Sequence, residues 1–249
     1  MNPLGSAKNK YKDLVVYFAI DNSKAHLRSM VATNLVMIIR ESVFKAVGAK
    51  KCWDRLVTDL KKMEGEGIKF KEDMVDILME FMIGDSLGQH LIGGFIESFS
   101  GTYFCRFCDI TKMSFRSNPS ITKPQRSKES YNLCVLRSNL TGKPSKGVKA
   151  SSEFNTLKLF HATSHLVPCI AHDLFEGVVS WDMAGIIAHF VNVKKWFTYQ
   201  RLNSRIKKFK CTGVDSRNKP ATVYVNGEKL GGHAVQNWTM LTLFFFNYW

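Results

Sequence analysis

Positions 13–20 read DLVVYFAI, and positions 30–40 read MVATNLVMIIR. Both runs are rich in β-branched and aromatic residues, which is typical of β-strands, although an apolar run as short as the second could also begin a helix. A third apolar run, at 74–83, leads into Gly84-Asp85 and predicts a buried strand. We expect the three strands to lie side by side in one sheet.

Helices are predicted for much of the remaining chain. Apolar residues recur at mostly helical spacing over 42–66, and four apolar residues spaced four apart form one stripe over 87–99. The segments 173–193 and 197–210 also have helical patterns, and Val-Tyr-Val followed by Asn-Gly at 223–227 predicts a hairpin turn. The sequence therefore predicts an α/β fold.

The charge of the chain is high and unevenly distributed. The 249 residues carry 35 Lys or Arg against 21 Asp or Glu, a net charge of +14. Nine cations and one acid fall in 112–149, and seven cations with no acid fall in 194–210. The first stretch is predicted to be a long solvated insertion. The charge excess favours a polyanionic partner such as DNA, although two basic stretches could also be solvated faces that aid solubility.

Neither a targeting segment nor a membrane span is predicted from the sequence. The first residues contain no apolar core of a signal peptide, and the apolar runs at 35–39 and 240–249 are too short to cross a bilayer. We therefore expect an intracellular chain with reduced thiols and no membrane partner. The nearly all apolar run at 240–249, MLTLFFFNYW, is expected to pack against residues that would follow it.

Two short motifs predict a structural zinc ion. Cys105 and Cys108 form a C-x-x-C pair, and Cys169 and His172 form a C-x-x-H pair about sixty residues later. Three thiolates and one imidazole make a closed tetrahedral zinc set. Cys134, His161 and His165 are substitute ligands, and the alternative is two buried thiols with a core histidine.

One carboxylate lies where α/β proteins place catalytic or metal-binding acids. Asp85 follows the predicted strand at 74–83, and such acids can hold Mg²⁺ at a scissile phosphate. The alternative is that Asp85 caps the helix that follows it. Glu97, within that helix, could be a surface residue or part of a buried pair.

His172-Asp173 gives a rival interpretation. Metal phosphohydrolases of the HD type place adjacent His and Asp on a helix, with another His upstream and another Asp downstream. His161 or His165, and Asp182, could fill those positions. The expected all-helical surroundings conflict with the predicted strands.

Three segments together resemble a transposon-derived animal protein family. They are NPLGS at 2–6, GDSLGQHLIGGFIESFSGTYFCRFC at 84–108 and FHATSHLVPCIAHDLFEG at 160–177. The family is among the eukaryotic cut-and-paste transposases with an RNase H-like DDE core, close to the Zisupton and CACTA-like groups. The resemblance covers roughly residues 1–245.

The resemblance implies a division of the chain and a set of roles. It implies a partial RNase H-like core over 1–104, a basic insertion linked by zinc over 105–172, and a mostly helical continuation over 173–249. Asp85 would be the second catalytic acid, and an intact relative would hold two Mg²⁺. The family's first acid lies upstream of the Asn-Pro-Leu-Gly segment and its third, a Glu, is expected late; Glu176 does not clearly fill that place.

The resemblance leads to a functional expectation. We expect a fragment of a relict or domesticated transposase, inactive by itself, nuclear, and bound to DNA rather than to a small-molecule substrate. The alternative is a zinc-stabilised, non-catalytic DNA-binding or interaction module. The residues expected to contact phosphates are Lys194, Lys195, Arg201, Arg205, Lys207, Lys208 and Lys210.

Overall fold

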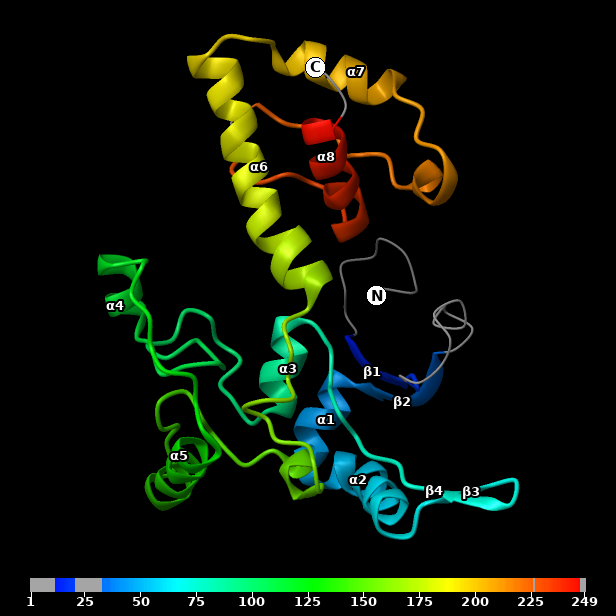
Figure 1. The fold of residues 1–249 in the computed structure, drawn as a ribbon. Helices are drawn as coiled ribbons and strands as arrows, with labels where there is room; N and C mark the ends of the chain where they lie inside the picture. Colours follow the sequence, from blue (N-terminus) through cyan, green and yellow to red (C-terminus); the bar gives the residue numbers. More distant parts are fainter. Residues whose placement is uncertain (1–11, 21–32, 226, 247–249) are drawn as a thin grey trace. The chain divides into compact units, whose positions relative to one another are not determined.

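The computed structural model describes residues 12–20, 33–225 and 227–246 (Figure 1). The chain divides into two compact units, and each is described by itself. The first unit comprises Met1–Met82 with Gly88–Leu166, and the second comprises Ile83–Leu87 with Val167–Trp249. The predicted boundary near residue 172 lies close to a boundary between units, whereas the predicted boundary at 104 lies within the first unit.

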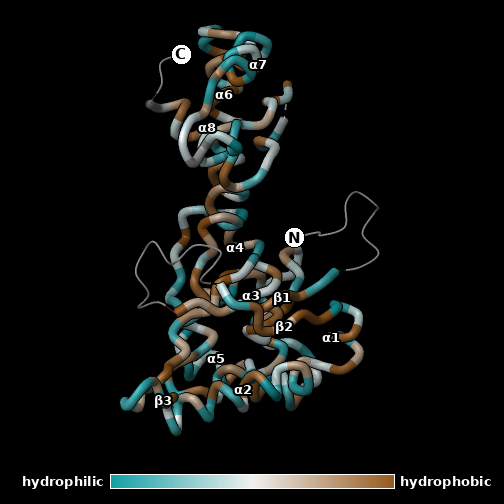
Figure 2. Tube along the Cα trace, turned by 90° about the vertical axis from the view of Figure 1, so that its right-hand side faces the viewer, coloured by the Kyte–Doolittle hydropathy of each residue, from teal (hydrophilic) through white to brown (hydrophobic). Residues whose placement is uncertain are grey.

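The first unit begins with an antiparallel pair of strands, β1 (Asp13–Phe18) and β2 (Asn34–Arg40). Their apolar sequences are visible in Figure 2. Leu14 pairs with Ile39 and Val16 pairs with Met37, and these four side chains pack against the core. The alternate residues point away from the core because successive side chains of a strand face opposite sides. The first two predicted strands are confirmed within the described residues; positions 30–32 of the second lie outside them.

Two helices follow where one was predicted. Helix α1 (Glu41–Val47) and helix α2 (Ala49–Glu66) are separated at Gly48, whose φ of 90° lies in the region that favours glycine. Helix α2 buries Trp53 and Val57 on one side. These residues, four apart, lie on the same helix face and so bring α2 onto the core.

The third predicted strand is wrong over most of its length. Strands β3 (Ile68–Phe70) and β4 (Asp73–Val75) form a separate two-stranded hairpin. Beyond β4 the chain is irregular until Met82, which makes an isolated parallel bridge to Leu166. The apolar run at 74–83 is not buried, since Leu78, Phe81 and Ile83 are all more than half exposed. Thus the described residues contain no three-stranded sheet with 74–83 beside β1 and β2.

Helix α3 (Ser86–Ile92) is shorter than the helix predicted over 87–99. It ends at Gly93-Gly94, and Gly94 has φ of 69°. A side chain at Gly94 would collide with the carbonyl oxygen of Ala150, only 2.1 Å from an added Cβ. The close backbone approach therefore requires glycine there and directs Phe95 into the core.

The basic stretch at 112–149 is mostly exposed, as predicted for a solvated insertion, but it also contributes buried residues to the core of the first unit. It forms helix α4 (Lys112–Ser117) and helix α5 (Lys128–Thr141). Tyr131, Cys134 and Val148 are buried in the same cluster as Trp53. The short 3₁₀ helix η3 (Glu153–Thr156) adds Phe154, whose ring lies edge-on to Trp53 at 5.3 Å between centroids.

All regular elements among the described residues of the second unit are helices, joined by irregular segments such as 218–225 and 227–233. A kinked helical stretch runs from Ile170 to Val193 as η4 (Ile170–Val178), α6 (Val179–Ala188) and η5 (His189–Val193). Helix α7 (Tyr199–Lys208), the short η6 (Gly213–Arg217) and α8 (Ala234–Phe246) follow. The predicted helices at 173–193 and 197–210 are confirmed. Around 223–227 the described residues form a turn, with Gly227 N donating to Tyr224 O at 3.2 Å, and no hairpin strands.

These helices share one core, to which Met183 and Ile187 of α6, Leu202 of α7 and Met240 and Phe244 of α8 contribute. By length and composition, the stretch Ile170–Val193 could cross a membrane, with a mean hydropathy of 1.3 in its most apolar window. A core helix of a soluble protein meets the same criterion. The chain thus mixes helices and strands, as predicted.

Acid is expected to destabilise the first unit through buried histidine. Burial, followed by the charge of Lys128, lowers the pKa of His161 from 6.5 to about 4. Between these values the unfolded chain binds a proton that the folded chain does not, so stability is lost as the pH falls through this window. The loss attributable to His161 is about 2–3 kcal/mol by pH 4. Burial lowers the pKa of His90 as well, which acts in the same direction.

Urea unfolding between pH 7 and pH 4 measures this effect. The free energy of unfolding of His161→Gln should depend less steeply on pH than that of the wild-type chain. Equal pH dependence in the variant and the wild-type chain would show that His161 titrates normally.

Candidate nucleic-acid interface

Helix α7 is anchored to the second unit along one face. Leu202 and Ile206 are buried in the core, four residues apart. Asn203 binds the backbone of Val223 in both directions, with its Nδ2 donating to Val223 O and its Oδ1 accepting from Val223 N, each at 2.9 Å. The Thr198 side chain caps the helix by accepting from Arg201 N at 3.1 Å. These contacts hold α7 without using any of its charged side chains.

The cations of α7 and of its flanks are all exposed. Leu202 and Ile206 occupy the buried face, so Arg201, Arg205, Lys207 and Lys208 are left to solvent. Three of these four lie in the last turn, where cations interact favourably with the helix dipole. Within the part of the chain that the structure describes, no ion pair engages the seven residues predicted to contact phosphates: Lys194, Lys195, Arg201, Arg205, Lys207, Lys208 and Lys210.

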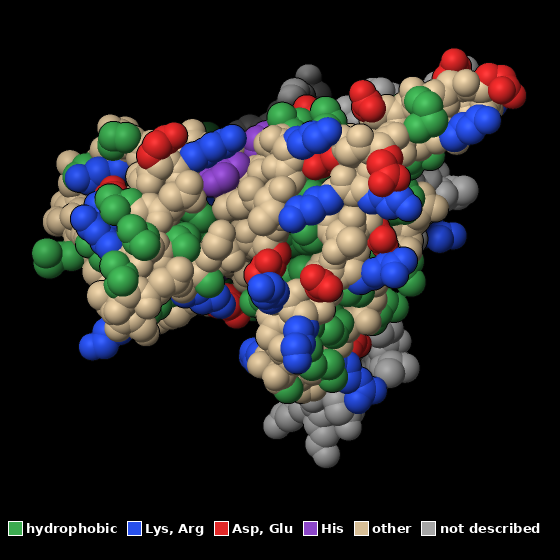
Figure 3. Space-filling model, turned by 90° about the horizontal axis from the view of Figure 1, so that it is seen from below, with side chains coloured by type: hydrophobic (Ala, Val, Ile, Leu, Met, Phe, Trp, Pro, Cys, Tyr) green, Lys and Arg blue, Asp and Glu red, His purple; other side chains and the backbone are tan. Residues whose placement is uncertain are grey.

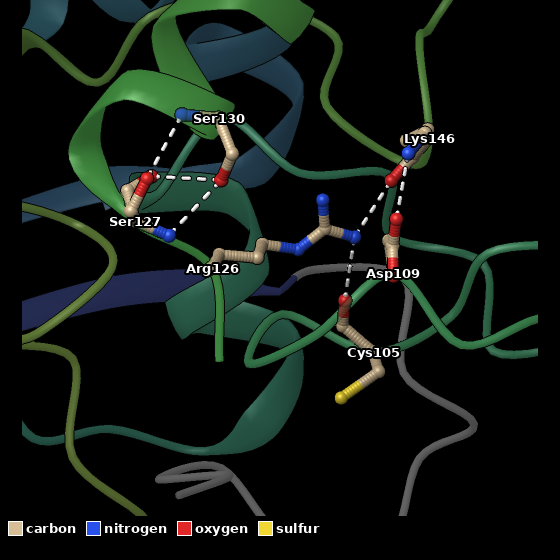
Figure 4. Close-up of polar contacts among 6 residues, drawn as sticks. All are labelled: Cys105, Asp109, Arg126, Ser127, Ser130 and Lys146. Atoms are coloured by element: carbon tan, nitrogen blue, oxygen red, sulfur yellow. Dashed lines mark hydrogen bonds and ion pairs between the residues drawn. The ribbon is translucent and has the colours of Figure 1, made fainter. Parts of the chain in front are cut away.

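The basic stretch at 112–149 uses several of its charges inside the first unit. Arg126 is only 6% exposed, and its Nη2 donates to Cys105 O at 3.1 Å and to Lys146 O at 2.7 Å (Figure 4). Lys146 pairs with Asp109 at 2.6 Å, and Lys149 pairs with Glu97. Thus three of its nine cations hold the fold together, which leaves 194–210 as the stronger phosphate-binding candidate.

Other parts of the surface carry both signs of charge. On the face drawn in Figure 3, Lys and Arg are interspersed with Asp and Glu. Helix α2 illustrates the pattern, because Arg55 pairs with Asp59 and Lys62 with Glu66 at i,i+4 spacing. Mixed charge of this kind aids solubility and gives no continuous anion-binding surface.

The C-x-x-C pair lies on a loop of the first unit that hydrogen bonds from Arg126 hold in place. Burial raises the pKa of the Cys108 thiol, and its contact with the Cys105 thiol raises it further. Arg126 N donates to Phe107 O at 2.7 Å, and the guanidinium of Arg106 lies 4.2 Å from the centre of the Phe107 ring. The structure therefore brings Cys105 and Cys108 together, as predicted.

The C-x-x-H pair is also brought together, at the start of the helical stretch in the second unit. Cys169 Sγ lies 3.1 Å from His172 Nδ1. The Asp173 carboxylate accepts a hydrogen bond from Cys169 N at 2.9 Å, directly before the helix begins at Ile170. The thiol is buried, while the imidazole is exposed.

Neither pair completes a zinc site within its own unit. A structural zinc ion takes four ligands, and the described residues contain no group of three or more His, Cys, Asp or Glu side chains placed to hold a metal. Zinc bound by these four residues therefore stays a prediction. Metal analysis of the purified chain tests it, with Cys105→Ser and Cys169→Ser compared against Cys211→Ser, which lies outside both motifs.

Asp85 occupies the position directly before α3, and its side chain is exposed. This position suits helix capping, the alternative considered for it. Glu97 belongs to the ion pair with Lys149, and Glu176 accepts from Ala234 N at 3.0 Å. Glu176 therefore ties the start of α8 to the long helical stretch.

In the HD-type interpretation, His172, Asp173 and Asp182 lie on the helical stretch of the second unit, and the described residues contain no group of three His, Cys, Asp or Glu side chains placed to hold a metal. Asp173 accepts a hydrogen bond from Cys169 N, and Asp182 is exposed on α6. In the first unit, His161 and His165 lie in turns and not on a helix, and His165 Nδ1 accepts from His161 N at 3.0 Å.

A pocket beside α7 was missed by the sequence analysis. It has a volume of about 540 Å³ and is lined by Phe190, Trp196, Phe197, Arg201, Leu202, Arg205 and Phe244. The order Lys-Lys-Trp-Phe at 194–197, just before Arg201, was a readable signal of basic residues interleaved with aromatic ones.

No protein-family model, no curated protein and no solved structure matches this chain. The function is therefore argued from the site itself.

Proposed function

We propose that this chain binds nucleic acid without sequence preference, through the basic face of α7 and its flanks. The observation that carries the proposal is the set of seven exposed cations in 194–210, a segment that contains no acid. Lys and Arg that contact phosphates displace condensed counterions, and this supplies affinity without reading the bases.

The arrangement of α7 supports this use of its charges. The helix is held by Leu202, Ile206 and Asn203 on its inner side, so its cations have no structural task there. In addition, Lys219 Nζ donates to Lys207 O at 2.7 Å and places an eighth cation at the end of the helix. A surface with this charge attracts any polyanion, and the affinity should fall as the ionic strength rises.

The resemblance of 84–108 and 160–177 to transposases makes DNA the proposed nucleic acid and the nucleus the proposed location. Under this proposal β1 and β2, followed by α1 and α2, would derive from an RNase H-like core, and Asp85 from its second acid. The antiparallel pair and the helices after it support the relation. The position of 74–83 outside that sheet counts against it.

Substitution of Lys207, Lys208 and Lys210 by Gln tests the proposal. If each lysine contacts one phosphate, the slope of log K against log salt concentration should become shallower by up to about three units. Binding should weaken alike on unrelated DNA sequences. Fluorescence anisotropy of labelled DNA between 50 and 200 mM salt measures both quantities.

The matched control removes the same charge elsewhere. Lys50, Lys51 and Lys61 are exposed on α2, and their combined substitution by Gln should reduce the slope by much less. If the two triple variants behave alike, binding reflects only the net charge of +14 and α7 is a solvated face.

A further inference from the structure

The pocket beside α7 combines a stacked aromatic wall with two arginines. The rings of Phe190 and Trp196 are stacked, with centroids 4.6 Å apart and planes 13° apart. Phe190 also stacks with Phe244 at 6.0 Å. All seven lining residues belong to the second unit.

Trp196 is held in place although it is 65% exposed. Its backbone N donates to Phe190 O at 3.1 Å, and the preceding Lys195 adopts a positive φ of 54°. A left-handed conformation is uncommon for a lysine and turns the chain sharply between η5 and α7. The loop thus fixes a large aromatic face at the pocket, where part of it remains open to solvent.

Arg201 and Arg205 supply the charge at the pocket. They are four residues apart on α7, so they lie on the same face of the helix. No acid lines the pocket among the residues that the structure describes. A guanidinium group can bind phosphate with two hydrogen bonds and can also stack on an aromatic ring.

We infer that the pocket binds one unstacked nucleotide of a single-stranded nucleic acid. The base would stack in the aromatic part, beside Trp196, and the adjoining phosphate would lie against Arg201 and Arg205. Flat aromatic side chains in a basic groove bind bases of any sequence, because every base has a π-face. The volume falls in the range of about 300–1,000 Å³ typical of ligand pockets.

This inference rests on the proposed function and adds the kind of nucleic acid. A base paired within a duplex does not present its face to such a pocket. The basic face of α7 should bind both forms through phosphates, whereas the pocket should act only on single strands. Single-stranded DNA is therefore expected to bind more tightly than a duplex of equal length.

Anisotropy titrations of the full chain with labelled dT20, with the dT20·dA20 duplex and with dTMP as competitor test the inference. Trp196→Ala should lose about 5- to 150-fold in affinity for dT20 and less than about twofold for the duplex. Trp196→Phe should retain most of the affinity because it keeps a stacking ring. Trp238→Ala, a half-exposed tryptophan outside the pocket, should match the wild-type chain.

Each outcome bears on the inference separately from the α7 proposal. If Trp196→Ala loses affinity for dT20 and for the duplex equally, or loses none, the inference that the pocket binds an unstacked nucleotide is wrong. If dTMP competes as strongly per molecule as dT20, the ligand is a free nucleotide and the strand assignment is wrong. If the α7 lysine variant binds normally while Trp196→Ala loses only dT20, the α7 proposal fails and the pocket stands. Should Trp196→Ala fail to fold, as judged by circular dichroism, Trp196→Leu, which keeps an apolar side chain but has no stacking ring, decides by the same comparison of dT20 with the duplex.

Discussion

Replacement of Trp53 by alanine is expected to lower the free energy of unfolding of the first unit by about 3–5 kcal/mol. The indole is 2% exposed and lies edge-on to the rings of Phe44 and Phe154, at centroid distances of 5.5 and 5.3 Å. Removing it leaves a cavity and also removes both aromatic contacts. Because those partners come from α1 and from η3, the loss should loosen three separated parts of the sequence together.

Urea unfolding followed by far-UV circular dichroism measures this loss. Trp181→Ala removes an indole that is half exposed on α6, and it should cost less than about 1 kcal/mol. A similar small cost for Trp53→Ala would mean that the aromatic cluster does not hold the first unit together.

Replacement of Arg126 by methionine is expected to cost about 2–4 kcal/mol of the first unit's stability. The guanidinium is buried and donates to the carbonyl oxygens of Cys105 and Lys146 (Figure 4). Methionine fills similar space but leaves both acceptors without their charged donor. The loop that carries Cys105 and Cys108 should therefore open more often.

Two readouts separate local loosening from global unfolding. The rate at which a thiol reagent modifies Cys105 and Cys108 should rise in Arg126→Met well before the urea transition. Arg137→Met changes an exposed residue of α5 and should leave both the rate and the midpoint unchanged. Unaltered thiol reactivity in Arg126→Met would show that the guanidinium does not hold the loop of Cys105 and Cys108 in place.

Periodicity in the sequence predicted the helices that bury one stripe of apolar residues and the strands in which buried and exposed residues alternate. Helix α7 buries only Leu202 and Ile206, so its pattern could be interpreted without knowing its partners. β1 and β2 could be recognised for a similar reason, since their alternate residues pack on the core. The run at 74–83 was predicted wrongly because a mostly apolar run is typical of a buried strand, whereas here the chain leaves much of it exposed.

The basic composition of the stretch at 112–149 gave no indication that its helix α5 packs on the core. Its nine cations suggested solvent, yet Tyr131, Cys134 and Ser138 are spaced three and four apart and form the buried side of α5. Long-range contacts decided the outcome: the Tyr131 hydroxyl donates to Gly93 O at 2.7 Å and accepts from Ser152 N at 3.0 Å. No local pattern encodes such partners.

The candidate sites were predictable in part. The spacing of each cysteine motif was enough to predict that its two members meet, and charge density alone located the face of α7. The pocket could not be predicted without the turn at Lys195, which brings the Trp196 ring onto the Phe190 ring. A turn of this kind follows from backbone conformation and has no clear sequence signal at a lysine.

The core of the first unit joins residues that are far apart along the chain. Lys158 N donates to the Glu64 carboxylate across 94 residues, at 2.9 Å. At a synthesis rate of about 5–20 residues per second, the ribosome needs roughly 5–20 s to produce that interval. During this time the apolar side of α2 has no partner from η3 and is available to chaperones or to other nascent chains. Folding of the first unit during translation must therefore wait until about residue 160 has emerged, and slower elongation would prolong the period of aggregation risk.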